Sequence, residues 1–453
     1  MAAATTPVDP SSLAVVRMAL GAVGVLSAVR IAAYGWIGRL YAGPSHRFTY
    51  LGFGWVPQPS RLGMAVLVAG LGLASLALAL GWRTRLAAVA VVVALGWIEL
   101  IDVTTYLNHY WFLTLVAALA VVAPVSAGAS LDARRAGGPR SVARGWVWLL
   151  RFQVGVVYAS AGLAKLQADW VVRALPLRLW LPAHADLPLV GSLLASPTTA
   201  HGLALAGAAF DVSIVPLLLW PRTRRFAWPV LVGFHVVTWA LFPIGVFPWV
   251  MIGASTIFFA PDWPRRLLVR AMARTGGRST SFLTGFSHEL RVQVPTRAPS
   301  ASAARRRWLL VGACAWVLVQ VALPLRHYAY PGDARWTGQG YRFAWNVLLT
   351  EKAGSASFLV TEPATGRHWI ADTTELYTPN QLRMMATEPD LIHQAARTIA
   401  ADERARGHHV QVRVDAWVSL NGRPAQRLID QTVDLAHVPR DPWSDAWILP
   451  LEE

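Results

Sequence analysis

The chain contains few cysteines, few lysines and few charged residues of either sign. Its 453 residues include one cysteine, Cys314, so no intramolecular disulfide can form and stability does not depend on an oxidising compartment. We expect Cys314, which lies in an apolar run, to be a small packing residue. Charged residues make up 15% of the chain and hydrophobic residues 55%, with mean hydropathy +0.40. A soluble domain has about a quarter of its residues charged, so water is not the main solvent here.

Long apolar runs recur between residues 12 and 327. A run of roughly 18 or more residues can cross a ~30 Å hydrocarbon layer as a helix. The first run contains Arg17 and Arg30 and follows no basic segment, so we expect it to be a retained span and not a cleaved signal peptide. The eighth run is short, and the expected number of spans is therefore eight or nine. The predicted spans are residues 12–37, 62–81, 86–104, 110–127, 146–166, 201–220, 226–246, 248–260 and 308–326.

The basic residues gather in alternate loops between the spans. A net charge of +16 would point to nucleic acid in a soluble protein, but this placement argues against such a partner. By the positive-inside rule the basic loops are cytoplasmic, so the N-terminus is expected inside and the C-terminal part outside the cell membrane. The stretch 271–307 is predicted to be a cytoplasmic linker. The residues that carry this prediction are Arg83, Arg85, Arg134, Arg135, Arg140, Arg144, Arg222, Arg224, Arg225 and those from Arg265 to Arg307.

After residue 328 the pattern becomes that of a soluble domain. Segments 357–360 and 410–419 are typical of strands, and Asn421-Gly422 is the dipeptide that a type I′ hairpin turn prefers. Helix starts are predicted at Thr378 and Glu388, each followed by proline.

The predicted fold is therefore a polytopic α-helical membrane bundle, residues 1–327, followed by an extracytoplasmic, β-rich α+β domain, residues 328–453. The sequence has no P-loop, dinucleotide fingerprint or Cys/His metal cluster, so neither nucleotide-driven transport nor a metal site is expected.

Ionisable residues inside apolar spans are costly and by default functional. They occur in DVTTYLNH (102–109), in AGLAKLQADW (161–170) and at His235. Lys165 is the strongest candidate, because a desolvated lysine, unlike arginine, can lose its proton and act as a base. The alternative is that Lys165 extends to the membrane interface and pairs with Asp169, one turn away.

Four further polar residues remain open between a packing role and a functional one. His109 is expected at the same membrane level as Lys165, so the two could face one pocket beneath the C-terminal domain. His201 begins the sixth span and Asp211 lies about three turns further on, where capping or helix packing is as plausible as function. His235, within the seventh span, is equally open.

Several segments, in order, resemble a known family. YLNHYW contains Asn108 and His109, AGLAKLQADW contains Lys165, and GFHVVTWALFPIG contains His235. PVDPSSLAVVRMALG, with Arg17, and YPGDARWTGQGYRFAW, residues 330–345, extend the similarity nearly end to end. The chain resembles a bacterial member of the vitamin K-dependent γ-glutamyl carboxylase family, whose membrane part is called the HTTM domain.

The resemblance implies an enzyme in which Lys165 deprotonates a reduced vitamin K or menaquinol-type naphthohydroquinone. Reaction with O2 then gives a strong base, which removes the γ-proton of a peptidyl glutamate before CO2 adds. His109 is implied to be the second catalytic residue, and Asn108 and His235 to bind the cofactor. No metal is implied. The expected partners are the lipid bilayer, the quinone and a Glu-containing peptide or protein.

Two alternatives follow from departures from the family pattern. With one cysteine the chain cannot form the disulfide of animal relatives, and it ends without their long C-terminal extension. It could be a quinol epoxidase without carboxylation, or a non-enzymatic quinone sensor or scaffold. Trp336, Tyr341 and Trp345 are expected either to contact a substrate or to form an interfacial aromatic belt.

Overall fold

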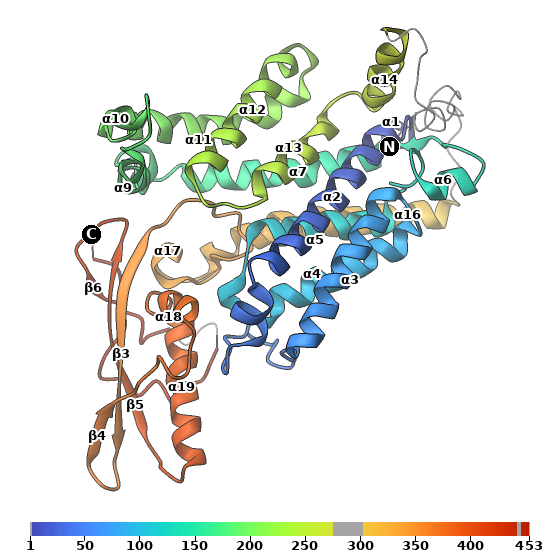
Figure 1. Cartoon of the computed structure of the whole chain (residues 1–453). Helices are drawn as coiled ribbons and strands as arrows, with labels where there is room; N and C mark the ends of the chain where they lie inside the picture. Colours follow the sequence, from blue (N-terminus) through green and yellow to red (C-terminus); the bar gives the residue numbers. More distant parts are fainter. Residues whose placement is uncertain (1, 275–301, 442–444, 453) are drawn as a thin grey trace.

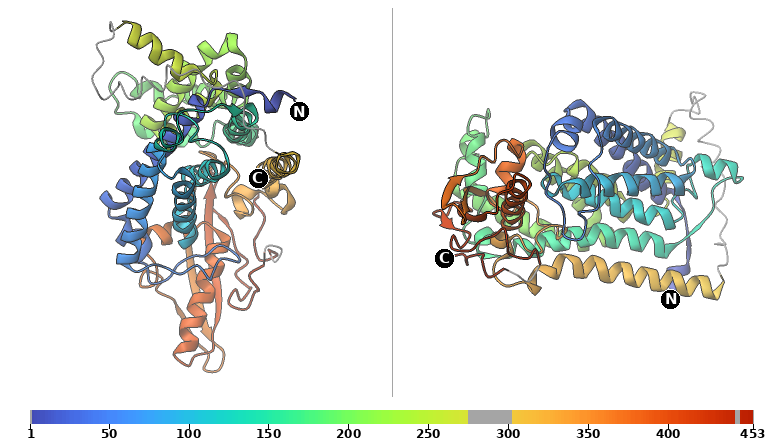
Figure 2. Two further views of the ribbon diagram at one scale, coloured as in Figure 1. Left: turned by 90° about the vertical axis from the view of Figure 1, so that its right-hand side faces the viewer. Right: turned by 90° about the horizontal axis from the view of Figure 1, so that it is seen from below.

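The computed structural model describes residues 2–274, 302–441 and 445–452. It consists of a helical region with a mixed α/β domain, formed by the C-terminal part, at one of its ends (Figures 1 and 2). Most of the predicted linker 271–307 lies outside the described residues. Its two ends are helical: α14 (Trp263–Arg274) continues to the last residue before the gap, and α16 (Ala303–Leu325) includes Arg305 to Arg307.

Six helices in the described part of the chain are long and apolar enough to cross a membrane. The other three predicted spans fall on helices that are shorter or less apolar than these six: two short apolar helices and one helix that is rich in arginine at its start. The shorter ones are α5 (Asn108–Val122) and α13 (Phe247–Ser255), and the arginine-rich one is α12 (Pro221–Leu241). The six candidate spans are α2 (Ser11–Ala33), α3 (Arg61–Leu80), α4 (Thr84–Ile101), α7 (Arg144–Lys165), α11 (Pro197–Leu219) and α16.

Helix α2 packs tightly on α3 because glycine leaves room for the backbone of its neighbour. A Cβ on Gly21 would lie 2.5 Å from the Ser75 carbonyl oxygen. Arg17, near the start of α2, is buried, and its guanidinium donates hydrogen bonds to backbone carbonyls of residues 78, 79, 125 and 129. A buried charge must be compensated, and these carbonyls do so. Arg17 thus ties together three chain segments, which is a structural role.

The C-terminal domain contains a four-stranded antiparallel sheet in the order β4-β3-β5-β6. Leu420 ends β5, and Asn421 and Gly422 then adopt positive φ values of 53° and 74°, which confirms the predicted turn. Helix α18 begins with a capping box at Thr378, as predicted, and α19 packs an apolar stripe against β5. The elements are β3 (Lys352–Glu362), β4 (Arg367–Ile370), α18 (Pro379–Met385), α19 (Pro389–Ala405), β5 (Gln411–Leu420) and β6 (Gln426–Arg427).

One segment before β3 enters the helical region. Trp345 is buried in the apolar core of the helices, with its ring centroid 6.1 Å from that of Phe112. Phe343, Trp345 and Leu348 all have φ near +60°, an uncommon and costly conformation for bulky residues. The C-terminal domain is therefore not a separate body beside the membrane part, because residues 343–349 are packed between helices.

Helices α1 (Ala2–Thr5), α6 (Leu131–Arg135) and α14 lie at the end of the helical region opposite to this domain (Figure 1).

Candidate functional site

Lys165 and Asp211 form a buried ion pair between two candidate spans. Lys165 is the last residue of α7, and its Nζ donates a hydrogen bond to Asp211 Oδ2 on α11 at 2.8 Å. The two side chains are 7% and 6% exposed. The predicted alternative, in which Lys165 pairs with Asp169, is wrong, because Asp169 is bound by arginines instead. The carboxylate that binds Lys165 is buried and comes from a residue 46 positions further along the chain. Lys165 is therefore not extended to the membrane surface.

A glycine one turn before Lys165 permits this pairing. A Cβ on Gly162 would lie 2.9 Å from Val212 Cγ2 and 3.0 Å from the Val212 backbone nitrogen. Any larger residue at this position would therefore push α7 away from α11. The close approach of the two helix backbones sets the short distance between the lysine and the aspartate.

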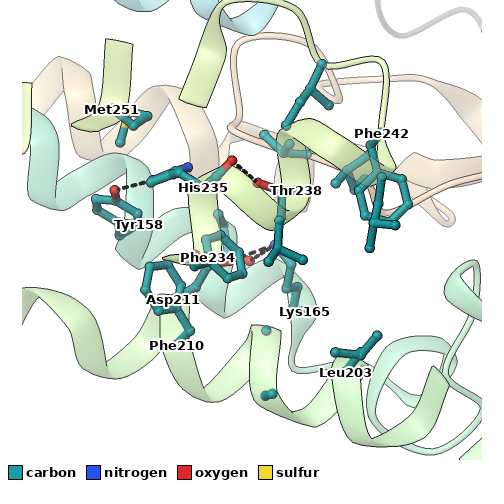
Figure 3. Close-up of a pocket in the computed structure, with 18 of the residues that line it drawn as sticks. Tyr158, Lys165, Leu203, Phe210, Asp211, Phe234, His235, Thr238, Phe242 and Met251 are labelled. Carbon is teal, nitrogen blue, oxygen red and sulfur yellow. Dashed lines mark hydrogen bonds and ion pairs between the residues drawn. The ribbon is translucent and has the colours of Figure 1, made fainter. Parts of the chain in front are cut away.

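The ion pair lies on the wall of a cavity of about 350 Å³ (Figure 3). Most of the lining side chains are apolar and come from α7, α11, α12 and α13, and the Phe210 and Phe234 rings stack with centroids 3.9 Å apart. Val347 and Leu348, from the segment that enters the helices, also line it. The polar lining side chains include Tyr158, Lys165, Asp211, His235 and Thr238. Ligand sites for small molecules have this composition, with apolar walls and few placed polar groups.

His235 faces this cavity, as its prediction as a binding residue requires. Its Nε2 lies 2.7 Å from the Tyr158 hydroxyl, which in turn lies 3.5 Å from Ser255 Oγ. Both His235 and Lys165 line the cavity, and Figure 3 shows the His235 ring directed toward Tyr158 and the Lys165 side chain toward Asp211. The sequence patterns did not identify Tyr158 as a partner of His235.

His109 and Asn108 lie elsewhere. Neither is among the residues that line the Lys165 cavity, so the expectation that His109 and Lys165 share one pocket is wrong for this cavity. His109 is buried on α5, and its Nε2 has no hydrogen-bond partner in the described part of the chain. Asn108 accepts a hydrogen bond from the Tyr106 hydroxyl at 2.8 Å, and that hydroxyl accepts one from the Phe343 backbone N–H. The segment that contains Phe343, Val347 and Leu348 therefore touches both places.

Asp169 joins the AGLAKLQADW segment to the C-terminal domain. Its carboxylate accepts hydrogen bonds from Arg335, Asn421 and Arg423 at 2.7–3.0 Å. Burial alone would raise the pKa of Asp169, but the hydrogen bonds from Arg423 and Asn421 and the charge of Arg335 hold it well below its usual range. The side chain therefore stays ionised at any physiological pH.

Other predicted residues have local roles. Trp336 and Trp345 are each 1% exposed, so neither forms a surface belt or contacts a substrate there. Tyr341 bonds to the Thr350 hydroxyl. His201 bonds to the Val172 carbonyl and so ties the start of α11 to the preceding segment. Cys314 is exposed on α16 and is not the buried packing residue that we expected.

The helices and the cavity define a multi-pass membrane protein in which an apolar cavity inside the bundle contains a pair of ionisable side chains. Comparison with known families makes the assignment specific. Residues 5–263 match the HTTM domain, and residues 305–453 match the lumenal domain of vitamin K-dependent gamma-carboxylase. The chain belongs to the vitamin K-dependent gamma-carboxylase family. No solved structure matches the chain.

Asp211 is the site residue whose role sequence reasoning left open. A single carboxylate in the middle of an apolar span was the available signal, since such a group needs a buried partner. Pairing it with Lys165 required knowing that α7 and α11 are in contact, which the sequence alone did not provide.

Proposed function

We propose that this protein is a vitamin K-dependent epoxidase and γ-glutamyl carboxylase-like enzyme in which Lys165 is the base. The observation that carries the proposal is the buried Lys165–Asp211 pair on the wall of an otherwise apolar cavity. Family membership supports it independently. A flat, lipid-soluble naphthohydroquinone fits apolar walls with stacked phenylalanines, and its hydroxyl groups need the few polar side chains.

The protein residues would act on protons and water. Lys165 passes its ammonium proton to Asp211 and takes up a proton from a hydroxyl group. The pair thereby gains one proton, and the lysine ammonium stays hydrogen-bonded to the Asp211 carboxyl group. The apolar walls exclude water, which would otherwise quench a strong base. A bound naphthohydroquinone would supply, together with O2, the basicity that no side chain possesses. CO2 is then the second co-substrate.

His109, with Asn108, is proposed as the second catalytic element, by resemblance. Because it does not line the Lys165 cavity, it would act from an adjoining position. Residues 343–349 connect the two positions. The Phe343 ring centroid lies 4.9 Å from that of Trp111, which is on α5 with His109, and Leu348 lines the Lys165 cavity. His235, with Tyr158, is proposed to contact the cofactor.

The proposed membrane arrangement has the N-terminus in the cytoplasm, eight or nine spans within residues 1–327, and residues 328–453 outside. It is supported by the positions of the arginine-rich α6 and α14 at the end of the bundle away from the C-terminal domain (Figure 1). A Glu-containing peptide would then approach from the side of the C-terminal domain.

Quinol epoxidation without carboxylation is the second candidate. Trp336 and Trp345, two of the aromatic residues expected to contact a peptide, are buried in the protein core. The quinone cavity does not depend on such contacts, so it could operate with another acceptor or none.

The test uses purified protein in lipid nanodiscs with menaquinol-4, O2, ¹⁴C-bicarbonate and a Glu-containing peptide. Epoxide and peptide-bound ¹⁴C are both measured, for the wild type and for Lys165→Ala. We expect epoxide from the wild type and none from the variant, and unchanged turnover in the variant would remove Lys165 as the base. Epoxide without ¹⁴C incorporation would favour the second candidate. Quinol binding without any epoxide, equal in both proteins, would indicate a sensor.

A further inference from the structure

Asp169 is the centre of a cluster that joins the hairpin turn of the C-terminal domain to the chain just after Lys165. We call Asp169, Arg335, Asn421 and Arg423 the Asp169 cluster. Arg423 binds the carboxylate with both terminal nitrogens, at 2.7 Å to Oδ1 and 3.0 Å to Oδ2. Arg335 and Asn421 reach Oδ2 at 2.8 and 3.0 Å. The Asp169 side chain is 1% exposed. Bidentate binding of a buried carboxylate by arginine is strong and fixes the orientation of the two side chains.

The residue after Asp169 forms part of the wall of the Lys165 cavity. The Lys165 ammonium lies 5.1 Å from the centroid of the Trp170 ring, within the range of a cation–π contact. The Trp170 Nε1 donates to the Ala204 carbonyl on α11 at 2.6 Å. Trp170 is 2% exposed, so its side chain is enclosed by its neighbours. A shift of Asp169 would therefore move a side chain that touches the lysine.

The C-terminal domain also reaches this region through two other contacts. Gly422, in the hairpin turn, packs against the Leu179 side chain. Asn421 accepts a hydrogen bond from the Glu351 backbone N–H, and Glu351 accepts one from Trp180 Nε1 at 2.6 Å. The hairpin turn, β3 and the chain after Lys165 are thus held as one unit, of which the Asp169 cluster is the charged part.

We propose that Asp169 is a positioning residue through which docking of the C-terminal domain sets the geometry, and so the reactivity, of Lys165. This inference rests on the proposed role of Lys165 but concerns a different residue and a different event. A change in the seating of the domain, as on engagement of a peptide substrate from that side, would reach the base through Asp169 and Trp170.

A purely local structural role for Asp169 predicts something else. Arg173 also binds Asp169 Oδ1, at 3.1 Å, but it comes from the same short segment and is 50% exposed. Losing Arg173 removes one positive partner and leaves the docking contacts intact. Losing Arg423 removes one positive partner and, with it, the bidentate contact that the C-terminal domain makes with Asp169. Arg173→Gln and Arg423→Gln are therefore a matched pair with the same change in charge at the same carboxylate.

The experiment measures acylation of the two lysines, Lys165 and Lys352, by a membrane-permeant acetyl ester, resolved by mass spectrometry on full-length protein in nanodiscs. Lys352 lies in the C-terminal domain, where its Nζ binds Glu388 at 3.3 Å and the Trp336 carbonyl oxygen at 3.0 Å instead of Asp169, and it serves as the internal reference. We expect Arg423→Gln and Asp169→Asn to raise the rate at Lys165 at least several-fold, with Lys352 unchanged. Arg173→Gln should leave both rates at the wild-type value, and Arg423→Lys should restore part of the effect.

Turnover of menaquinol-4 gives a second readout. Arg423→Gln is expected to lower kcat more than it raises KM, because the walls that bind the quinol stay in place while the base is displaced. Equal labelling rates in Arg173→Gln and Arg423→Gln would overturn the proposal, and so would an increase at Lys352 as large as that at Lys165, which signals unfolding. Wild-type protein without turnover would contradict the proposed function alone, since the labelling ratio still tests the positioning role.

Discussion

Lys165 Nζ lies 2.8 Å from Asp211 Oδ2, and both side chains are almost completely removed from solvent. Inside a bilayer such a pair is expensive to form, because both groups must leave water. In a bundle whose other wall residues are mostly apolar, the pair contributes little net stability. It is therefore best explained by what it does for a ligand in the cavity beside it.

The first prediction separates stability from chemistry at this pair. Removing one partner leaves an uncompensated buried charge, so Asp211→Leu should destabilise the protein by about 3–5 kcal/mol. The double variant Lys165→Met/Asp211→Leu replaces the pair by apolar side chains and should regain most of that loss. It should nevertheless remain inactive.

The measurement is thermal unfolding in detergent together with epoxide formation for the wild type, both single variants and the double variant. Recovery of activity in the double variant would show that the pair is only structural. Failure of the double variant to recover stability would mean that the two side chains do not act as a buried pair.

The second prediction concerns the glycine that brings α7 and α11 together. A methyl group on Gly162 would meet the Val212 backbone at 3.0 Å, so Gly162→Ala must separate the helices locally. Displacement of a catalytic group by a fraction of an ångström to an ångström can lower turnover up to about 100-fold. We expect a loss of tens-fold in kcat with folded, quinol-binding protein.

Gly155, two turns earlier on the same helix, provides the control. A Cβ there would lie 3.4 Å from Val215 Cγ1, an ordinary contact with the same neighbouring helix. Gly155→Ala should therefore keep wild-type turnover. Equal losses in the two variants would show that the effect comes from helix packing in general and not from the distance between Lys165 and Asp211.

The third prediction distinguishes the two histidines. His235 faces the Lys165 cavity and His109 does not. His235→Ala should weaken binding of menaquinol-4, measured by quenching of tryptophan fluorescence, since Trp170 lines the cavity. His109→Ala should leave that affinity within about two-fold while lowering turnover. If His109→Ala weakens binding as much as His235→Ala, the two residues share one ligand site after all.

The positions of the helices could be predicted from the sequence, and their contacts could not. Apolar runs predicted the six candidate spans of the described residues, because a span must be apolar over its whole length. The same uniformity hides which face of a span meets its neighbour, so the pairing of Lys165 with Asp211 was not visible. Asp169 looked like the partner because it lies one turn further along the sequence, but α7 ends at Lys165 and the carboxylate turns to the C-terminal domain.

The C-terminal domain shows the same contrast. The Asn421-Gly422 turn followed from local chemistry, because positive φ at both central positions is tolerated by these residues. The entry of residues 343–349 among the helices did not follow, since three bulky residues with φ near +60° contradict local preference and exist only because tertiary contacts impose them. Trp345 is accordingly a core residue of the helical region and not a surface aromatic.

The last prediction concerns the pH dependence of the C-terminal domain. His393 on α19 is 3% exposed, and its Nε2 lies 3.0 Å from the Val438 carbonyl oxygen. Burial lowers the pKa of His393, against the opposing effect of that hydrogen bond. The unfolded chain therefore binds a proton at a higher pH, near 6.5, than the folded one. Stability contributed by the neutral ring is complete above that value and is lost as pH falls below it, with a slope of at most about 1.4 kcal/mol per pH unit.

His393→Gln cannot take up a proton but can still donate to Val438, so its stability should change less between pH 7 and pH 5 than that of the wild type. Hydrogen exchange of α19 in the full-length protein measures this locally. His368→Gln, at an exposed position on β4, should keep the wild-type slope. A wild-type protein whose α19 protection is constant from pH 7 to pH 5 would show that the ring is not buried neutral. The acid sensitivity predicted here then arises in the C-terminal domain itself, because Asp169, with its depressed pKa, stays ionised throughout this range and keeps the domain docked.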